Sequence, residues 1–254
     1  MAILAVIPAR LAAVRLLRKP LRELGGVPIV VRVWQHVCAM NVADRVVVAT
    51  ESDEVAAAVG KAGAECVLTS PLQASGTDRV AEVSMMQPFR SFDLVCNVQG
   101  DEPFLTAEGV RGALAQVNDA GFPIGTASVA AGDAVLHDAS IVKVVCADDG
   151  RALYFSRAAI PHLRDTADRG AHAGLVRQHL GVYAYTRSAL AQWVALPQHP
   201  LEIAERLEQL RPLAAGMAIG VAMAGEAPLM GGIDTEADLT RANVVWAEFT
   251  AGRA

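Results

Sequence analysis

Four cations follow the first apolar segment of this chain, because Arg10, Arg15, Arg18 and Lys19 lie within ten positions. The apolar segment itself, Ile3 to Ile7, directly precedes them in a protein whose formal net charge is -5. An apolar run of this length is typical of a strand buried on both faces of a parallel sheet. Open α/β sheets bind ligands at the carboxyl ends of such strands. The cations therefore indicate an anion-binding loop, and a solvated basic loop is the other interpretation.

Carboxylates occur at two points that suit a bound cation. Asp101 and Glu102 follow the apolar run Leu94–Val98, and Asp234 lies in the glycine-rich bend 231–235. Mg²⁺ is usually held by one or two protein carboxylates together with substrate phosphates and water, so Asp101 and Asp234 would suffice. Asp234 is equally well placed to cap the amino terminus of the last predicted helix.

A third group of polar residues opens a predicted helix. Ser75 and Asp78 have the spacing of a capping box, which explains both residues but leaves Gly76 and Arg79 without a role. A helix amino terminus with a glycine and a nearby arginine also suits a nucleotide or another anion. His179, before an apolar segment, is either a substrate ligand or a structural histidine.

Strand-like and helix-like segments alternate through the first half of the chain. Strands are expected at Ile3 to Ile7, Asp44 to Thr50, Glu65 to Leu68, Leu94 to Val98 and Ile124 to Ala130. Helices are expected at Pro28 to Met40, Ser52 to Ala62, from Ser75 onward, and Thr106 to Val117. This alternation predicts a doubly wound, mostly parallel α/β sheet of the nucleotide-binding kind.

The rhythm changes from Val142 onward. Short strands are expected at Val142 to Cys146, Ala152 to Phe155 and Gly181 to Tyr185, with a hairpin turn at 148–150 and a mobile surface loop at 161–175. Helices at Arg187 to Ala195 and Leu201 to Leu210 follow, then a strand at Ala218 to Met223 and a helix at Thr235 to Glu248 that return to the main sheet. We therefore expect a core formed by residues 1–135 and 215–254, with a smaller inserted α+β subdomain at 136–214.

Composition excludes several classes of protein. With 254 residues, 53% of them hydrophobic, the chain can bury a substantial core, which argues against disorder. No apolar run reaches the roughly 18 residues of a membrane span, and the start of the chain lacks the pattern of a signal peptide, so we expect a cytoplasmic protein without a membrane partner. The net negative charge argues against nucleic acid as a partner. The four cysteines fit neither a metal site nor a disulfide framework.

Together, the polar motifs resemble one known family over essentially the whole chain, the 3-deoxy-manno-octulosonate cytidylyltransferases, or CMP-Kdo synthetases. Eight motifs occur in the order seen in that family: Ile7-Pro8-Ala9-Arg10 with Arg15-Leu16 and Lys19-Pro20-Leu21; Ser75 to Glu82; Asn97 to Pro103; Val142 to Val145; Ala152 to Arg157; His179-Leu180-Gly181; Leu207 to Arg211; and Asp234-Thr235.

The resemblance implies a nucleotide-diphospho-sugar transferase-like fold and a homodimer formed through the second subdomain. It implies a Mg²⁺-dependent transfer of CMP from CTP to the anomeric hydroxyl of 3-deoxy-D-manno-octulosonate (Kdo), with release of pyrophosphate, in lipopolysaccharide biosynthesis. Nucleotidyl transfer depends mainly on positioning and charge neutralisation, which cations and a metal supply.

The resemblance also assigns roles to residues. The catalytic residues would be Arg10, Lys19 and Asp101. The nucleotide would be bound by Pro8, Ala9, Arg10, Arg15, Lys19, Ser75, Gly76, Asp78 and Arg79. The sugar acid would be bound by Gln99, Arg157, His179, Tyr185, Glu208 and Gln209. The metal ligands would be Asp101 and Asp234.

The chain departs from the family in the basic loop. Leu17 and Arg18 replace Pro-Gly, and Ala13 and Val14 replace Ser-Thr, which removes backbone freedom and hydroxyl donors from the expected phosphate site. The guanidinium of Arg18 would either reach phosphate oxygens in compensation or point to solvent.

Two further departures lie in the second part of the chain, where Asp138 to Ser140 and Pro161 to Leu163 replace Asn-Pro-Asn and Pro-Trp patterns. They leave two alternatives open. One is cytidylyl transfer to a related acidic sugar. The other is a nucleotide-binding homologue with impaired catalysis that acts as a partner or regulator.

Overall fold

A computed structural model describes residues 1–12, 15–165, 170 and 172–251 of the chain. These residues form two compact units, which are described separately below. Unit 1 comprises Met1–Ala107 and Pro228–Ala254, and unit 2 comprises Glu108–Ala227. The departures at Ala13 and Val14 lie outside the described residues, as do positions 166–169 and 171 of the expected surface loop.

Unit 1 is built on four parallel strands in the order β6-β1-β4-β5. Their bounds are β1 Ile3–Pro8, β4 Arg45–Thr50, β5 Glu65–Leu68 and β6 Leu94–Val98. The central strand β1 is buried from Leu4 to Pro8, as expected for an apolar strand covered on both faces. The predicted parallel α/β sheet is confirmed in this unit.

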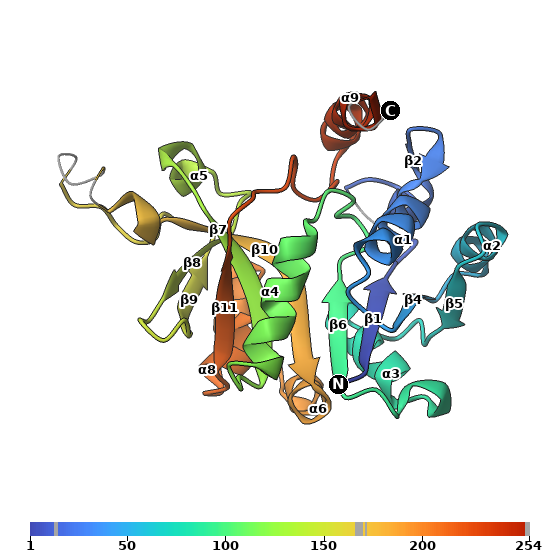
Figure 1. Cartoon of the computed structure of the whole chain (residues 1–254), viewed down its shortest axis with the longest axis horizontal. Helices are drawn as coiled ribbons and strands as arrows, with labels where there is room; N and C mark the ends of the chain where they lie inside the picture. The colour runs from blue at the N-terminus through green and yellow to red at the C-terminus, as the bar shows by residue number, and fades with distance from the viewer. Residues whose placement is uncertain (13–14, 166–169, 171, 252–254) are drawn as a thin grey trace. The chain divides into compact units, whose positions relative to one another are not determined.

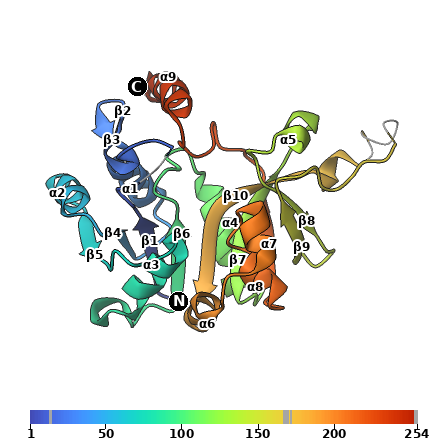
Figure 2. The same cartoon turned by 180° about the vertical axis from the view of Figure 1, so that it is seen from behind.

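Helices cover both faces of this sheet. Figures 1 and 2, taken from opposite sides, show α1 (Ile29–Met40) and α2 (Asp53–Lys61) over one face and α3 (Gly76–Met85) over the other. Ser52 caps α2 by accepting a hydrogen bond from the backbone of Val55, and Ser75 with Asp78 forms the predicted capping box of α3. These side chains satisfy backbone N–H groups that have no partner within the helix.

The carboxyl ends of β1 and β6 lie very close together, and this proximity shapes the region where a ligand would bind. A Cβ atom at Gly100 would lie only 2.6 Å from the carbonyl oxygen of Pro8. Glycine at position 100 therefore allows the turn after β6 to lie against the end of β1.

The end of the chain packs beside an early hairpin of the same unit. Helix α9 (Glu236–Ala251) lies beside β2 (Glu23–Leu24), which pairs with β3 (Val27–Pro28) (Figure 1). Asn243 accepts a hydrogen bond from the backbone N–H of Gly25 (2.9 Å) and donates one to the carbonyl oxygen of Glu23 (3.2 Å). Two short 3₁₀ helices, Lys19–Leu21 and Gln87–Phe89, complete the unit.

Unit 2 contains a mixed arrangement of strands. Strand β7 (Ile124–Ala130) pairs in parallel with β11 (Ile219–Ala224) and antiparallel with β10 (Arg177–Thr186). Strand β8 (Lys143–Cys146) pairs antiparallel with β10 and with β9 (Ala152–Ser156), which confirms the predicted hairpin.

The helices of unit 2 lie on both sides of these strands. Helix α4 (Ala107–Asn118) lies against β7 and β11, and α7 (Pro200–Glu205) with α8 (Leu210–Ala214) lies on the opposite side (Figures 1 and 2). A Cβ atom at Gly125 would lie 2.1 Å from the carbonyl oxygen of Ala113, so glycine in β7 permits the close approach of α4. Helices α5 (Asp133–His137) and α6 (Arg187–Ala195) and a 3₁₀ helix at Ala173–Leu175 are also present.

Two details of the predicted elements were wrong. The single helix expected at 201–210 is two short helices, because Arg206 adopts a left-handed conformation (φ 56°) that ends α7. Strand β10 begins at Arg177, four residues earlier than expected from the apolar run, because polar residues at its start still pair with β7. The expected insertion at 136–214 lies within unit 2, which also contains α4, β7 and β11.

Candidate active site

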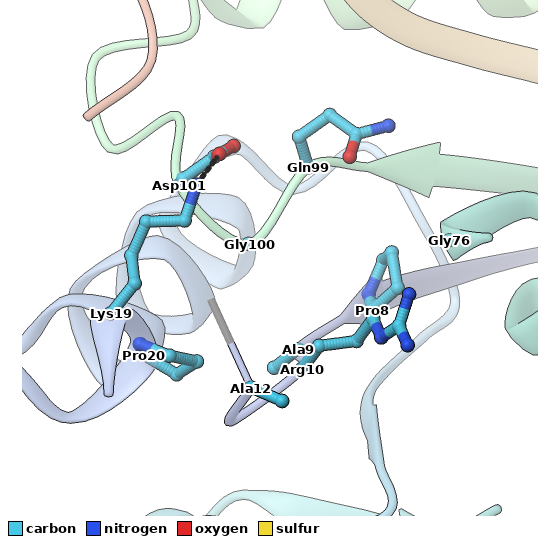
Figure 3. Close-up of a pocket in the computed structure, with 10 residues that line it drawn as sticks. All are labelled: Pro8, Ala9, Arg10, Ala12, Lys19, Pro20, Gly76, Gln99, Gly100 and Asp101. Carbon is cyan, nitrogen blue, oxygen red and sulfur yellow. Dashed lines mark hydrogen bonds and ion pairs between the residues drawn. The ribbon is translucent and has the colours of Figure 1, made fainter. Parts of the chain in front are cut away.

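A pocket of about 230 Å³ opens at the carboxyl ends of β1 and β6 in unit 1. Its walls come from the end of β1, the basic loop, the start of α3 and the turn after β6. The lining residues, drawn in Figure 3, are Pro8, Ala9, Arg10, Ala12, Lys19, Pro20, Gly76, Gln99, Gly100 and Asp101. The sequence-predicted nucleotide residues Pro8, Ala9, Arg10, Lys19 and Gly76 are thus brought together here.

Lys19 is the cation most closely held at this pocket. Its ammonium group bonds to Asp101 (Figure 3) and donates a second hydrogen bond to Oδ1 of Asp234 over 2.9 Å. Burial opposes the charge on Lys19, but the two carboxylates outweigh it and raise the pKa of Lys19 above its usual value. Lys19 therefore stays protonated and can face an anionic ligand.

Asp234 does not cap the last helix. Thr235 does so, because its Oγ1 accepts a hydrogen bond from the backbone N–H of Asp238 (3.2 Å). The carboxylate of Asp238 in return accepts from the backbone N–H of Thr235 (2.9 Å). The carboxylate of Asp234 is thereby left to contact Lys19 and the guanidinium of Arg15 at 3.0 Å.

The positions of Asp101 and Asp234 fit a divalent cation that also binds substrate phosphates. Both carboxylates already converge on one cationic group, the ammonium of Lys19. Among the described residues no cluster of three or more His, Cys, Asp or Glu side chains is placed to hold a metal ion. Two carboxylates completed by phosphate oxygens and water are the usual arrangement for Mg²⁺.

Glu102, next to Asp101, carries a strongly perturbed carboxyl group. Burial, reinforced by the nearby negative charges of Asp101 and Asp234, raises the pKa of Glu102 to about 8. The side chain of Glu102 therefore adds little negative charge beside Asp101 and Asp234 at neutral pH.

The other cations of the basic loop point to different partners. Arg10 donates to the carbonyl oxygen of Ala74 (3.2 Å), which ties the loop to the segment before α3. Arg18 occupies a left-handed conformation (φ 57°), and its exposed guanidinium pairs with Glu54 on α2. Arg18 does not line the pocket. Its guanidinium therefore neither reaches the expected phosphate site nor simply points to solvent, because it pairs with Glu54.

The residues at the start of α3 divide into two groups. Gly76 lines the pocket, where a Cβ atom would lie 3.3 Å from Cγ of Pro8. Ser75 and Asp78 are engaged with each other in the capping box. Arg79, which the resemblance assigns to the nucleotide, does not line the pocket; its side chain is completely buried and pairs with Glu51 at 2.8 Å.

Arg157 is the centre of a polar network in unit 2. Its backbone N–H donates to the carboxylate of Glu205 (2.9 Å), and its Nη1 donates to the carbonyl oxygens of Ala139 and Ser140 (3.2 Å each). Lys143 lies beneath it, fully buried, and donates to three backbone carbonyl oxygens, those of Asp138, Ile141 and Arg157, at 2.6–2.8 Å. The network fixes the segment 138–141 and the backbone of Arg157.

The remaining residues expected at the sugar acid lie in or near the core of unit 2. His179 packs against the rings of Phe155 and Tyr183, and its Nε2 contacts Oγ1 of Thr126 at 2.9 Å. Burial lowers the pKa of His179 to about 3, so the ring is neutral at neutral pH. Tyr185 is fully buried against Trp193, and Gln209 is also buried, whereas Glu208 is half-buried. Gln99 lies in unit 1 and lines the pocket described above.

Sequence reasoning missed two acidic residues that hold the expected site residues. Glu51 pairs with Arg79, and Glu205 binds the backbone of Arg157 and the hydroxyl of Ser156. Glu51 carries a usable signal, because it directly follows β4 at the same edge of the sheet as Arg10 and Asp101. Glu205 has no such signal, since only folding brings it beside β9.

Comparison with known proteins adds independent information. A family profile described as Cytidylyltransferase matches residues 4–219. A 3-deoxy-manno-octulosonate cytidylyltransferase of Gemmatimonas aurantiaca is 59% identical over 246 residues, which cover 97% of this chain and 95% of that protein. One of Synechococcus elongatus is 44% identical over 253 residues, which cover 96% of this chain and 98% of that protein.

Solved structures agree with this similarity. A CMP:2-keto-3-deoxy-manno-octonic acid synthetase complexed with CTP superposes with a TM-score of 0.88 at 34% identity, covering 98% of this chain and 100% of that one. An inositol-1-phosphate CTP transferase from T. maritima has a TM-score of 0.67 at 16% identity, covering 98% and 96% of the two chains, so it shares the fold alone.

Among the helices that the structure describes, none is long and apolar enough to cross a membrane.

Proposed function

The chain belongs to the 3-deoxy-manno-octulosonate cytidylyltransferase family, and from that premise we propose that it transfers CMP from CTP to the anomeric hydroxyl of Kdo. Pyrophosphate would be the second product. The observation that carries the proposal is the pocket at the ends of β1 and β6, which Arg10, Lys19 and Asp101 all line. Cations suited to a triphosphate and a carboxylate suited to a metal ion meet there within one unit.

Lys19 and Arg10 would bind and orient the triphosphate. Lys19 is only 18% exposed in its side chain, so its charge acts in a poorly solvated environment where electrostatic interactions are strong. Fixed cations of this kind stabilise negative charge that develops on the leaving pyrophosphate without reorganisation at the moment of reaction. Binding of the triphosphate would require Lys19 to share its ammonium group between the phosphates and the two carboxylates.

Asp101 and Asp234 would hold Mg²⁺, which this proposal includes as the metal cofactor. When bound, Mg²⁺ would neutralise phosphate charge and lower the pKa of the attacking hydroxyl. The two carboxylates come from distant parts of the chain, after β6 and before α9, and their convergence on Lys19 supports this assignment. Gly76 and the backbone of Pro8 and Ala9 would frame the cytosine.

Residues of unit 2 would recognise the sugar acid. Arg157 supplies the cation that a sugar carboxylate requires, and its backbone is held by Glu205 and Lys143. His179 is neutral at neutral pH, so it would act as a hydrogen-bonding group and not as a second cation. Glu208 and Gln209 follow α7, in the segment that the family resemblance assigns to the sugar.

Three further parts of the proposal concern the biological setting. Product CMP-Kdo would serve lipopolysaccharide biosynthesis, and because CTP is a cytoplasmic nucleotide we expect the enzyme in the cytoplasm. We also propose a homodimer formed through unit 2. In its support, Leu201 and Ile203 on α7 are 40% and 50% exposed. A monomeric mass by light scattering at micromolar concentration would contradict the dimer.

Pyrophosphate release with CTP, Mg²⁺ and a panel of sugar acids tests the proposed reaction. Release is expected with Kdo and not when CTP is replaced by other nucleoside triphosphates. Release only with another acidic sugar would favour the first alternative, a related cytidylyltransferase. Binding of CTP without release for any sugar would favour an impaired homologue that acts as a partner.

A further inference from the structure

The side chain of Arg79 is buried and does not line the nucleotide pocket. It projects from α3, is completely buried, and its Nη2 lies 2.8 Å from Oε2 of Glu51. A second nitrogen, Nη1, bonds to the hydroxyl of Thr69 at the end of β5. In this structure the guanidinium of Arg79 contacts protein groups on other segments of unit 1.

The partner of Arg79 connects it to the basic loop. Oε1 of Glu51 accepts a hydrogen bond from the backbone N–H of Leu11 over 3.0 Å, and Leu11 lies between the pocket residues Arg10 and Ala12. The two oxygens of the Glu51 carboxylate thus have different partners. Oε1 accepts a hydrogen bond from the basic loop, and Oε2 forms the ion pair with Arg79.

The charged groups near Arg79 explain why it needs the carboxylate of Glu51. Burial lowers the pKa of Arg79, the charge of Glu51 opposes that effect, and the nearby charge of Arg10 adds to it. Arg79 is therefore attracted by the carboxylates of Glu51 and Glu82 and repelled by Arg10. Removing Glu51 would leave Arg79 buried without its ion-pair partner and the repulsion from Arg10 less compensated.

Stability alone does not account for the pair. Replacing a buried ion pair with apolar residues is often neutral or stabilising, so such a pair is weak evidence for a stabilising role. In addition, Nε and Nη2 of Arg79 and Oε2 of Glu51 have no hydrogen-bond partner in the part of the chain that the structure describes, so Nη2 and Oε2 interact as an ion pair only and the burial of this guanidinium is incompletely compensated.

We propose that Arg79 and Glu51 are positioning residues for the nucleotide pocket, holding the loop at Leu11 so that Arg10 and Lys19 meet the triphosphate. The inference rests on the proposed function, because it assumes that CTP occupies this pocket. In this proposal Arg79 does not contact the nucleotide. Loss of the Arg79–Glu51 pair should weaken the binding of CTP and leave the binding of the sugar acid unchanged.

The test substitutes Arg79→Lys, because the single ammonium group of lysine cannot reach both Glu51 and Thr69. A matched control is Arg211→Lys. Arg211 forms a similarly buried pair with Glu202 in unit 2, with both side chains 6% exposed and nitrogen–oxygen distances of 2.6 and 2.9 Å. Glu51→Gln is a second test variant that preserves side-chain volume and affects a carboxylate that is 16% exposed.

CTP binding is measured by calorimetry in the absence of sugar, at a temperature well below the melting temperature of each variant. The KM values for CTP and for the sugar acid are measured in steady-state assays. We expect Arg79→Lys to raise the Kd and KM for CTP by about tenfold or more, as for loss of a charged hydrogen bond. Glu51→Gln should act in the same direction, the KM for the sugar acid should change little, and amide exchange at Leu11 should become faster in both variants. Arg211→Lys should lower the melting temperature and leave the Kd for CTP unchanged.

Wild-type affinity for CTP in both Arg79→Lys and Glu51→Gln would overturn the inference while leaving the proposed function intact. An equal loss of CTP affinity in Arg211→Lys would also overturn it, because general destabilisation would then explain the effect. Failure of the wild-type protein to bind CTP would overturn the proposed function, and the inference with it.

Discussion

Lys19 and Asp234 are 215 positions apart in the chain, yet the ammonium group of Lys19 donates a hydrogen bond to Oδ1 of Asp234 over 2.9 Å. The same ammonium group bonds to Asp101. A residue of the basic loop therefore joins the turn after β6 to the segment before α9. Three segments that have no sequence proximity meet at one cation, and this meeting defines the centre of the candidate active site.

Substitution Lys19→Ala should lower the rate of CMP transfer by about a hundredfold or more, because one preorganised charge on the phosphates is lost. Two carboxylates, those of Asp101 and Asp234, would also lose their shared cation. Steady-state rates at saturating CTP measure the effect. Lys61→Ala is the matched control, since Lys61 is exposed at the end of α2 and does not line the pocket. Near wild-type turnover in Lys19→Ala would remove this residue from the mechanism.

Substitution Asp101→Asn should abolish turnover and leave the fold intact. The carboxylate lies at the mouth of the pocket, 24% exposed, and its charge faces Lys19 and not the core. Turnover is measured across a range of Mg²⁺ concentrations, with circular dichroism to verify folding. Asp53→Asn, an exposed residue of the first turn of α2, serves as the control. If Asp101→Asn kept its activity at low Mg²⁺, the proposed metal site would be wrong.

Substitution Arg18→Gly should stabilise the protein slightly without weakening CTP binding. The left-handed conformation of Arg18 (φ 57°) is unfavourable for any residue with a Cβ atom, and glycine would relieve about 1 kcal/mol. The ion pair with Glu54 offsets little of this gain, because both side chains are more than half exposed.

Chemical denaturation and CTP titration of the wild type, Arg18→Gly and Leu17→Pro/Arg18→Gly measure both effects. If Arg18→Gly bound CTP clearly more weakly, the guanidinium would be compensating for the backbone donors lost from the basic loop, and its pairing with Glu54 would not describe its role.

Stability should fall with acidification between about pH 6.5 and pH 3 because of His179. The folded-state pKa of about 3 lies below the ordinary value of 6.5, so in this range the unfolded chain binds one more proton than the folded chain. The slope from this residue is at most about 1.4 kcal/mol per pH unit. Denaturation midpoints of the wild type and His179→Gln across this range measure it. An identical pH slope in the two proteins would mean that the ring of His179 is already accessible to protons when folded.

Much of the fold could be predicted from the sequence, because local patterns agree with the tertiary structure. The bounds of β5, β6 and β7 match the predicted apolar runs, and the capping residues Ser52 and Ser75 mark helix starts as expected. The break at Arg206 could not be predicted, since left-handed backbone at an arginine has no local signal. The start of β10 was missed because its first residues are polar, and their pairing with β7 has no local signal in the sequence.

The candidate site could be predicted only in part. Residues at the carboxyl ends of strands, such as Arg10 and Asp101, are placed by the parallel sheet itself. Interactions between distant side chains are different, because the pairing of Arg79 with Glu51 and of Arg157 with Glu205 depends on packing that no spacing in the sequence reveals. The choice between Asp234 and Thr235 as the helix cap likewise required the position of Lys19.

The central claim is that the pocket beside Lys19 and Asp101 transfers CMP from CTP to Kdo. Phosphorus NMR of a reaction containing CTP, Kdo and Mg²⁺ tests it most directly, because it observes the bond that forms and the bond that breaks. We expect equal amounts of pyrophosphate and of a new CMP–sugar phosphodiester with wild-type protein, and neither above background with Asp101→Asn. Pyrophosphate without the phosphodiester, or equal product from Asp101→Asn, would contradict it.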